Sequence, residues 1–279
     1  MNFAASKLFS LDGKTAIITG ASGYLGRTMV RGLLENGARV LALGRSERLH
    51  LEVQGWKNEF GEKYVEGHQI DMYDLPALTE LFDRIVAQEV TVDVLVNNAH
   101  ELGPKTGFNV PEGTLEFSTY DHWHRNWLGG VYWPALAVQK IGLKMKSSGK
   151  GSIVNISSMY GAIAPSPLLY EDTDFVNPPA YSASKAALLA FTRYTASFWG
   201  RHGVRANAIL PGPFSNVEDT GSNSVTDGDF FLERLKSRNC LGRIGRPAEL
   251  IGCLLYLSSD ASSYMTGQAL SVDGGWTII

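Results

Sequence analysis

The 279-residue chain contains only two cysteines, Cys240 and Cys253, and no Cys-x-x-Cys pair. This scarcity argues against both a disulfide framework and a zinc site. The chain also lacks a strong excess of charge, since 25 basic residues stand against 28 acidic ones and the formal net charge is −3. A chain with so little net charge has no long-range attraction for nucleic acid or for an anionic membrane, so we expect neither as a partner.

No long apolar run opens the chain, because Lys7, Ser10, Asp12 and Gly13 interrupt the apolar residues at its start. A secretory signal peptide needs an apolar core of roughly 7–15 residues, so we expect a cytoplasmic protein. The nucleophile elbow of a serine hydrolase, Gly-x-Ser-x-Gly, is also missing. No pair of histidines has metal-ligand spacing either, and we expect no bound metal.

Strand-like and helix-like stretches alternate along the chain. The expected strands are Lys14–Thr19, Arg39–Leu43, Lys63–Ile70, Val92–Val96, Gly151–Ser157, Val204–Leu210 and Gln268–Val272. The expected helices are the stretch ending at Asn36, Leu75–Gln88, Thr119–Lys146, Ala180–Gly200, Asp229–Arg238 and Pro247–Ser258. This alternation is typical of an α/β doubly wound parallel sheet of the Rossmann type. No linker or repeat divides the series, so we expect a single domain over residues 1–279.

A glycine-rich turn lies between the first strand and the first helix, with the sequence Gly20-Ala-Ser-Gly23-Tyr-Leu-Gly26. In this setting the first glycine makes a tight turn, the second admits a pyrophosphate, and the third lets the helix pack closely on the strand. A phosphate-binding P-loop would need Gly-Lys-Ser/Thr, whereas Arg27 follows the last glycine. The turn therefore predicts a dinucleotide site, with contacts from Gly20, Ser22, Gly23, Tyr24, Leu25 and Gly26.

Tyr181 and Lys185 stand four positions apart in a helix-forming run, so they share one face of the helix. An ammonium beside a phenol stabilises the phenolate and should lower its pKa toward the working range. We therefore expect Tyr181 to be a proton shuttle. The strand that ends at Ser158 comes shortly before it and makes that serine a neighbour of the tyrosine.

The second strand ends in Leu43-Gly44-Arg45-Ser46, with no carboxylate where an NAD site would place one. A guanidinium binds a phosphate through paired hydrogen bonds, so Arg45 favours NADP(H). The alternative is that Arg45 stacks on the adenine ring and tolerates NAD(H) as well.

Two long connections interrupt the regular pattern, the Pro-rich segment 162–179 and the Gly/Ser/Asn-rich segment 211–245. Connections of this length are usually lids or binding loops, and both should emerge at the carboxyl edge of the sheet. We expect 162–179 to line a substrate pocket and 211–245 to act as a lid.

With these motifs in place, the chain resembles the short-chain dehydrogenase/reductase family, in its compact single-domain branch. The matching motifs are Thr19-Gly20…Gly26, Asp71, Asn97-Asn98-Ala99, Asn126, Ile153–Ser158, Tyr181–Lys185, Val204–Asn207, Pro211-Gly212, Thr266–Gln268 and Val272–Gly275. The resemblance implies a catalytic set of Tyr181 as acid/base, Lys185 on the nicotinamide ribose, Ser158 on the substrate oxygen, and Asn126 at a water relay. It also implies cofactor contacts from Asp71, Met72, Asn98, Ala99, Tyr181, Lys185, Pro211 and Gly212.

Three departures from the family pattern bear on the substrate. The glycine spacing is that of the extended branch, His100 replaces the glycine after Asn98-Ala99, and segment 162–179 contains an insertion before Tyr181. We expect His100, with Ser158 and Tyr181, to contact the substrate.

The resemblance implies an NAD(P)-dependent oxidoreductase that interconverts an alcohol and a carbonyl on a small polar, sugar-like substrate. A nucleotide-sugar epimerase or dehydratase is one alternative, favoured by the glycine spacing, and an idle dinucleotide sensor is another. The intact catalytic set favours an enzyme. Four aromatic residues recur at roughly helical spacing in the long helix, which indicates core or subunit packing: Trp123, Trp127, Tyr132 and Trp133. The resemblance makes that helix a dimer face, so we expect a homodimer or homotetramer.

Overall fold

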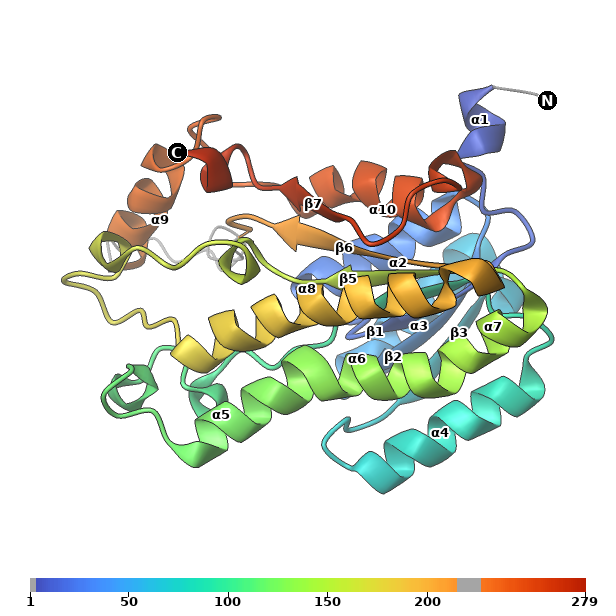
Figure 1. Cartoon of the computed structure of the whole chain (residues 1–279), viewed down its shortest axis with the longest axis horizontal. Coiled ribbons are helices and arrows are strands. Elements are labelled where there is room, and N and C mark those ends of the chain that lie inside the picture. The colour runs from blue at the N-terminus through green and yellow to red at the C-terminus, as the bar shows by residue number, and fades with distance from the viewer. Residues whose placement is uncertain (1–3, 215–226) are drawn as a thin grey trace.

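The structure, a computed structural model, describes residues 4–214 and 227–279. Its centre is one seven-stranded, fully parallel sheet with the order β3-β2-β1-β4-β5-β6-β7 (Figure 1). The strands are β1 Thr15–Thr19, β2 Arg39–Gly44, β3 Val65–Gln69, β4 Val94–Asn97, β5 Gly151–Ile156, β6 Val204–Pro211 and β7 Ala269–Val272. The predicted doubly wound Rossmann-type fold is confirmed.

Helices cover both faces of the sheet (Figure 1). They are α1 Ala5–Leu8, α2 Tyr24–Glu35, α3 Arg48–Phe60, α4 Leu75–Gln88, α5 Tyr120–Trp127, α6 Trp133–Ala137, α7 Leu143–Ser148, α8 Pro179–Trp199, α9 Asp227–Ser237 and α10 Ile251–Ser258. One core joins α2, α3 and α10 to one face, and a second core joins α4, α6, α7 and α8 to the other. Because strand side chains alternate, Ile17 of β1 enters one core while Ala16 and Ile18 enter the other.

The predicted helix Thr119–Lys146 is observed as one long helical stretch from α5 to α7 (Figure 1). Two π-helical turns, Leu128–Tyr132 and Val138–Gly142, separate the α-helical parts. The Thr119 hydroxyl oxygen accepts a hydrogen bond from the backbone N–H of His122 at 3.2 Å. This bond caps the start of the helix. The first π turn follows directly after α5, which contains Asn126, and such turns are frequent at functional sites.

Two helices, the four-residue α1 and the longer α3, were not predicted. Helix α3 is the one that enters the core. It buries Leu49, Val53 and Trp56, which are spaced four and three positions apart and form a narrow apolar stripe. Polar residues and Gly55 surround that stripe, so the sequence pattern over this segment is weak.

A smaller apolar cluster packs beside the carboxyl edge of the sheet. It joins Leu169 and Tyr170 of segment 162–179 to Phe231, Leu232 and Leu235 of α9. The predicted lid, 211–245, is described only at 211–214 and 227–245, and its remaining part lies outside the described residues. The cluster ties the two long connections to each other next to the ends of the strands.

Candidate active site

The glycine-rich turn opens a cleft of about 470 Å³ at the carboxyl edge of the sheet. Gly20 has φ +69°, and its carbonyl oxygen lies 2.0 Å from where a Cβ on Gly26 would stand. A positive φ is the left-handed conformation that favours glycine, and only glycine at position 26 lets α2 start so close to β1. The N-terminus of α2 borders this cleft, and its positive dipole suits a phosphate.

The opposite side of the turn is held by Asn98, just after β4. Its side-chain Nδ2 donates to the carbonyl oxygens of Thr19 and Gly20 at 3.0 and 3.1 Å. The backbone N–H groups of Asn98 and Ala99 both donate to the hydroxyl of Thr19 at 3.1 Å. Asn98 and Ala99 thus fix the cleft wall that the sequence assigned to the cofactor.

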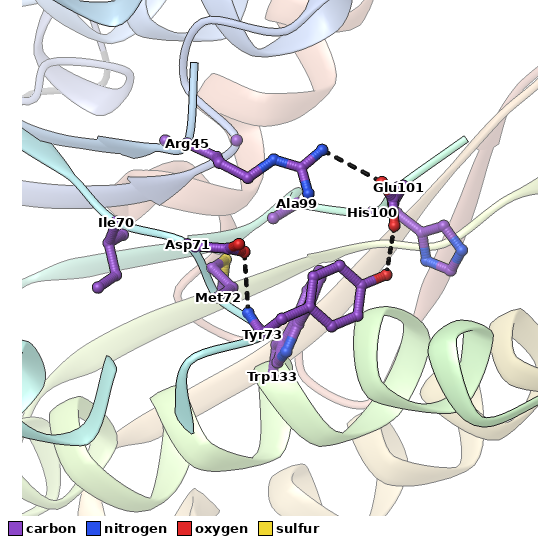
Figure 2. A pocket seen from close by; sticks show the side chains of 11 residues that line it. Arg45, Ile70, Asp71, Met72, Tyr73, Ala99, His100, Glu101 and Trp133 are labelled. Atoms are coloured by element: carbon purple, nitrogen blue, oxygen red, sulfur yellow. Dashed lines mark hydrogen bonds and ion pairs between the residues drawn. The ribbon is translucent and has the colours of Figure 1, made fainter. Parts of the chain in front are cut away.

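A smaller pocket of about 130 Å³ adjoins the cleft and shares Gly20, Arg45 and Ala99 with it. Figure 2 shows Arg45 pointing across this pocket toward Glu101, with Asp71, Met72 and Tyr73 below it. Arg45 Nη2 lies 3.2 Å from Glu101 Oε1, and the Tyr73 hydroxyl donates to Glu101 Oε2 at 2.6 Å. An ion pair therefore spans the place expected for the adenosine end of the cofactor.

Glu101 is ionised in this arrangement. Burial raises the pKa of its carboxyl, but hydrogen bonds from Tyr73 and Arg45 outweigh burial and lower the pKa overall. Glu101 was not predicted as a site residue, although it directly follows the Asn97–His100 motif at the end of a strand.

Ser158, Tyr181 and Lys185 come together at the inner end of the large cleft. Ser158 follows β5, whereas Tyr181 and Lys185 lie in the first turns of α8. Lys185 Nζ donates to the carbonyl oxygen of Ile156 at 3.0 Å and lies 5.7 Å from the centre of the Tyr181 ring. The predicted proximity of the ammonium and the phenol is therefore observed.

The expected lowering of the Tyr181 pKa is wrong. Burial raises the pKa of the phenol, and a hydrogen bond with Ser158 lowers it only in part. Burial also lowers the pKa of the Lys185 ammonium to about 7. The spacing of Tyr181 and Lys185 indicated that the two side chains are neighbours, but it did not reveal that burial removes both from water. Desolvation disfavours the charged form of each group.

His100 and Asn126 form a second pair behind Tyr181. Asn126 is fully buried, its Nδ2 donates to the carbonyl oxygens of Thr106 and His122 at 2.8 Å, and its Oδ1 lies 3.2 Å from His100 Nε2. The His100 ring meets the Tyr181 ring edge-on at 5.1 Å between centres. Burial, and then the Lys185 charge, lower the pKa of His100 to about 3, so its imidazole is neutral.

A third cavity of about 270 Å³ lies on the far side of Ser158 and Tyr181. Its walls include Phe108, Tyr170, Phe175, Asn177 and Phe231. Phe175 of segment 162–179 stacks on Phe231 of α9 at 4.4 Å between ring centres. Segment 162–179 therefore lines this cavity, and its role in substrate binding stays a prediction. Phe231 lies in the predicted lid 211–245, whereas the contribution of Phe108 was not foreseen.

The predicted cofactor residues line the two connected cavities. The larger cleft is lined by Gly20, Ser22, Gly23, Tyr24, Leu25, Gly26, Arg45, Asn98, Ala99, Tyr181, Lys185, Pro211 and Gly212. The smaller pocket adds Asp71 and Met72. His100 lines both of these cavities, but it is not among the residues that line the cavity of Phe108 and Phe231. Asn126 lines none of the three.

Within residues 4–214 and 227–279, no three His, Cys, Asp or Glu side chains are grouped in a way that could hold a metal ion. Over the same residues, no helix is both long and apolar enough to span a membrane.

Comparison with known proteins gives matches along nearly the whole chain. A family model described as enoyl-(acyl carrier protein) reductase matches residues 20–277. The gluconate 5-dehydrogenase of Gluconobacter oxydans is 34% identical over 272 residues, covering 97% of each chain. The NADP-dependent mannitol dehydrogenase of Hypocrea jecorina is 33% identical, covering 97% of this chain and 94% of the other. A crystal structure of a gluconate 5-dehydrogenase from Burkholderia cenocepacia, in complex with NADP and tartrate, superposes with a TM-score of 0.83 at 28% identity and covers 99% of both chains.

Proposed function

The chain belongs to the short-chain dehydrogenase/reductase family and is an NAD(P)-dependent oxidoreductase that interconverts an alcohol and a carbonyl; we propose that Tyr181 moves the proton, that NADP(H) is the cofactor, and that the substrate is small, polar and sugar-like. One observation carries the proposal: Ser158 and Tyr181 line both the large cleft and the cavity beyond it. A group at that junction can reach a cofactor on one side and a substrate on the other.

The bound cofactor supplies or accepts the hydride. The Tyr181 phenol is protonated at neutral pH, since a free phenol titrates near about 10 and burial raises the pKa of this one further. The protonated form is the one that gives a proton to a carbonyl oxygen during reduction. Ser158 hydrogen-bonds to Tyr181 and is proposed to hold the same oxygen. In the oxidation direction the same phenol oxygen takes the proton from the alcohol.

Lys185 is proposed to hold the nicotinamide ribose. Its ammonium has three donors, one of which goes to the carbonyl oxygen of Ile156, and the residue lines the cleft. Asn126 is proposed to position His100, because its side chain is bonded to that imidazole and to two backbone carbonyls. His100 is proposed to pack against Tyr181 and to contact the substrate from that side.

The proposed cofactor assignment rests on Arg45 and the glycine turn. Arg45 borders both the large cleft and the smaller pocket, so a ribose phosphate at their junction would meet its guanidinium. The turn and the start of α2 form a cradle, lined by Ser22, Gly23 and Tyr24, that suits a pyrophosphate. NAD(H) is the alternative, since Asp71 and Glu101 border the smaller pocket and a carboxylate there could accept hydrogen bonds from ribose hydroxyls.

We further propose a cytoplasmic, single-domain protein over residues 1–279, with 162–179 as a substrate-binding insertion and 211–245 as a lid. A homodimer or homotetramer is supported by exposed aromatic residues on and beside α5 and on α8, two helices that pack against each other. These residues are Tyr120, Trp123, Trp127, Tyr132, Tyr194 and Phe198. Aromatic side chains of this kind are common at subunit interfaces.

The test of the reaction is the substitution Tyr181→Phe, which removes the phenol oxygen and keeps the ring. Turnover should fall roughly 10²-fold or more, while cofactor affinity measured by nicotinamide fluorescence should change little. Tyr160→Phe is the matched control. Tyr160 also lines the cavity of Phe108 and Phe231, but its hydroxyl is hydrogen-bonded to the Tyr170 hydroxyl at 3.0 Å. Near-normal turnover in Tyr181→Phe, or an equal loss in Tyr160→Phe, would contradict the assignment.

A further inference from the structure

We infer that the substrate carries no negative charge, so that a polyol or ketose is preferred to a sugar acid of the same carbon skeleton. This rests on the proposed function, because it concerns the cavity that adjoins Tyr181. Sugar acids such as gluconate carry a carboxylate at neutral pH. A cavity that takes them gains most from a cation, because an ion pair offsets the loss of hydration that a carboxylate suffers on burial.

The outer cavity, which is the cavity lined by Phe108 and Phe231, offers no cation among the residues that the structure describes. Its lining is mainly aromatic and aliphatic, and its polar members are hydroxyl and amide side chains: Asn109, Ser158, Tyr160, Tyr170, Asn177 and Tyr181. His100, which packs on Tyr181 from behind, has a neutral imidazole because burial lowers its pKa to about 3. A carboxylate in this cavity would lose its hydration without gaining a charged partner.

Three basic side chains come from elements that border the cavity, but none of them lines it. Arg234 donates to the backbone carbonyl oxygens of Leu169 and Glu171 in segment 162–179. Arg238 places its guanidinium 5.6 Å from the centre of the Trp276 ring. Lys185 lines the cofactor cleft, and its ammonium donates to the carbonyl oxygen of Ile156.

The connection between Phe214 and Phe231, both of which line the outer cavity, adds no cation in its sequence. Residues 215–230 contain no Lys, Arg or His, and their charged members are all acidic: Glu218, Asp219, Asp227 and Asp229.

The polar members of the wall suit a hydroxylated molecule, because hydroxyl and amide groups can both donate to and accept from substrate hydroxyls. The stacked rings of Phe175 and Phe231 offer an apolar surface for its carbon skeleton.

The experiment compares sorbitol with gluconate, which differ only in one terminal group, an uncharged hydroxymethyl against a carboxylate. Using the full chain with NADP⁺, we expect kcat/KM to be at least about tenfold higher for sorbitol. The pair mannitol and mannonate repeats the comparison with a different hydroxyl configuration. A preference for the acid in either pair would overturn the inference.

A cation placed in the wall supplies a second measurement. Val176 lines the cavity and is partly buried, so Val176→Lys should raise kcat/KM for gluconate several-fold and leave sorbitol unimproved. Val176→Met is the control for side-chain length without charge. Equal effects of both substitutions on gluconate would count against a charge-based preference.

The two proposals fail in different ways. If wild type oxidises gluconate better than sorbitol and Tyr181→Phe abolishes that turnover, the reaction stands and the charge inference is wrong. If no alcohol of either charge class changes nicotinamide absorbance, the proposed function fails and the inference falls with it.

Discussion

Arg45 has two competing partners, because its guanidinium is paired with Glu101 and is also the proposed phosphate ligand (Figure 2). The Arg45 side chain is 54% exposed, so the pair contributes little to stability on its own. A phosphate carries more negative charge than a carboxylate and can accept the same donors. Arg45 is therefore able to exchange one partner for the other.

Arg45→Ala should lower kcat/KM with NADP(H) by about 10- to 100-fold, since charge-assisted hydrogen bonds to an ionic ligand contribute about 1.5–3 kcal/mol. The value with NAD(H) should change much less, because that cofactor lacks the phosphate. Steady-state kinetics with both cofactors measure this directly.

Arg48→Ala is the control, because Arg48 lies on α3, is paired with Glu52, and lines neither cofactor cavity. A variant of Arg45 that loses activity equally with both cofactors would show that it supports the pocket rather than the phosphate.

Short motifs in the sequence predicted the residues that line the two connected cavities, and their role in cofactor binding stays a prediction. The sequence did not identify Glu101 as the partner of Arg45, because those residues are 56 positions apart and meet only through the order of β2, β1 and β4. The direction of the Tyr181 pKa was also missed. Burial depends on the packing of α8 against the rest of the molecule, which residue spacing does not reveal.

At the scale of elements, two glycines of the β1–α2 turn have different roles, one mainly in folding and the other mainly in the proposed cofactor binding. A Cβ on Gly26 would lie 2.0 Å from the carbonyl oxygen of Gly20, an impossible contact with backbone. A Cβ on Gly23 would lie 3.2 Å from the same oxygen, which a small shift can relieve. The two positions therefore differ in what a methyl group would disturb.

Gly26→Ala should lower the free energy of unfolding by about 1–3 kcal/mol, because α2 must move away from β1. Gly23→Ala should lower it by less than about 1 kcal/mol but weaken cofactor binding, since Gly23 faces the proposed pyrophosphate site. Urea unfolding and cofactor titration distinguish the two effects. Equal destabilisation by both substitutions would refute this division of roles.

Elements with strong periodicity were predicted with nearly the observed bounds, as α4 and α8 illustrate. Helix α3 was missed because its apolar stripe is narrow and contains Gly55, and it forms because Leu49, Val53 and Trp56 complete a core with α2 and β2. The two π turns were also not foreseen. Each adds a residue to a turn of the long helix, and a local change of this kind leaves the apolar pattern of the sequence almost unaltered.

At the scale of the whole molecule, the exposed aromatic side of α5 and α8 bears on assembly. Trp127 is 53% exposed and Phe198 is 60% exposed, although both are large apolar residues. We expect Trp127→Glu to shift the protein toward a monomer, because a charge in the centre of an apolar interface must be desolvated. Light scattering coupled to size-exclusion chromatography measures the molar mass.

Leu51→Glu is the control for this experiment, because Leu51 is an exposed apolar residue of α3, which packs on the opposite face of the sheet. Its oligomeric state should match that of the wild type. A wild-type protein that is monomeric at micromolar concentration would contradict the proposed assembly.

The strand order also has a consequence for synthesis on the ribosome. β1 pairs with β2 on one side and with β4 on the other, yet β1 ends at Thr19 and β4 begins only at Val94. At a synthesis rate of about 5–20 residues per second, β4 emerges roughly 4–15 s after β1. Throughout that interval the apolar edge of β1 presents unpaired N–H and C=O groups. We expect chaperone contacts to concentrate on this edge, in the part of the chain that later holds the cofactor.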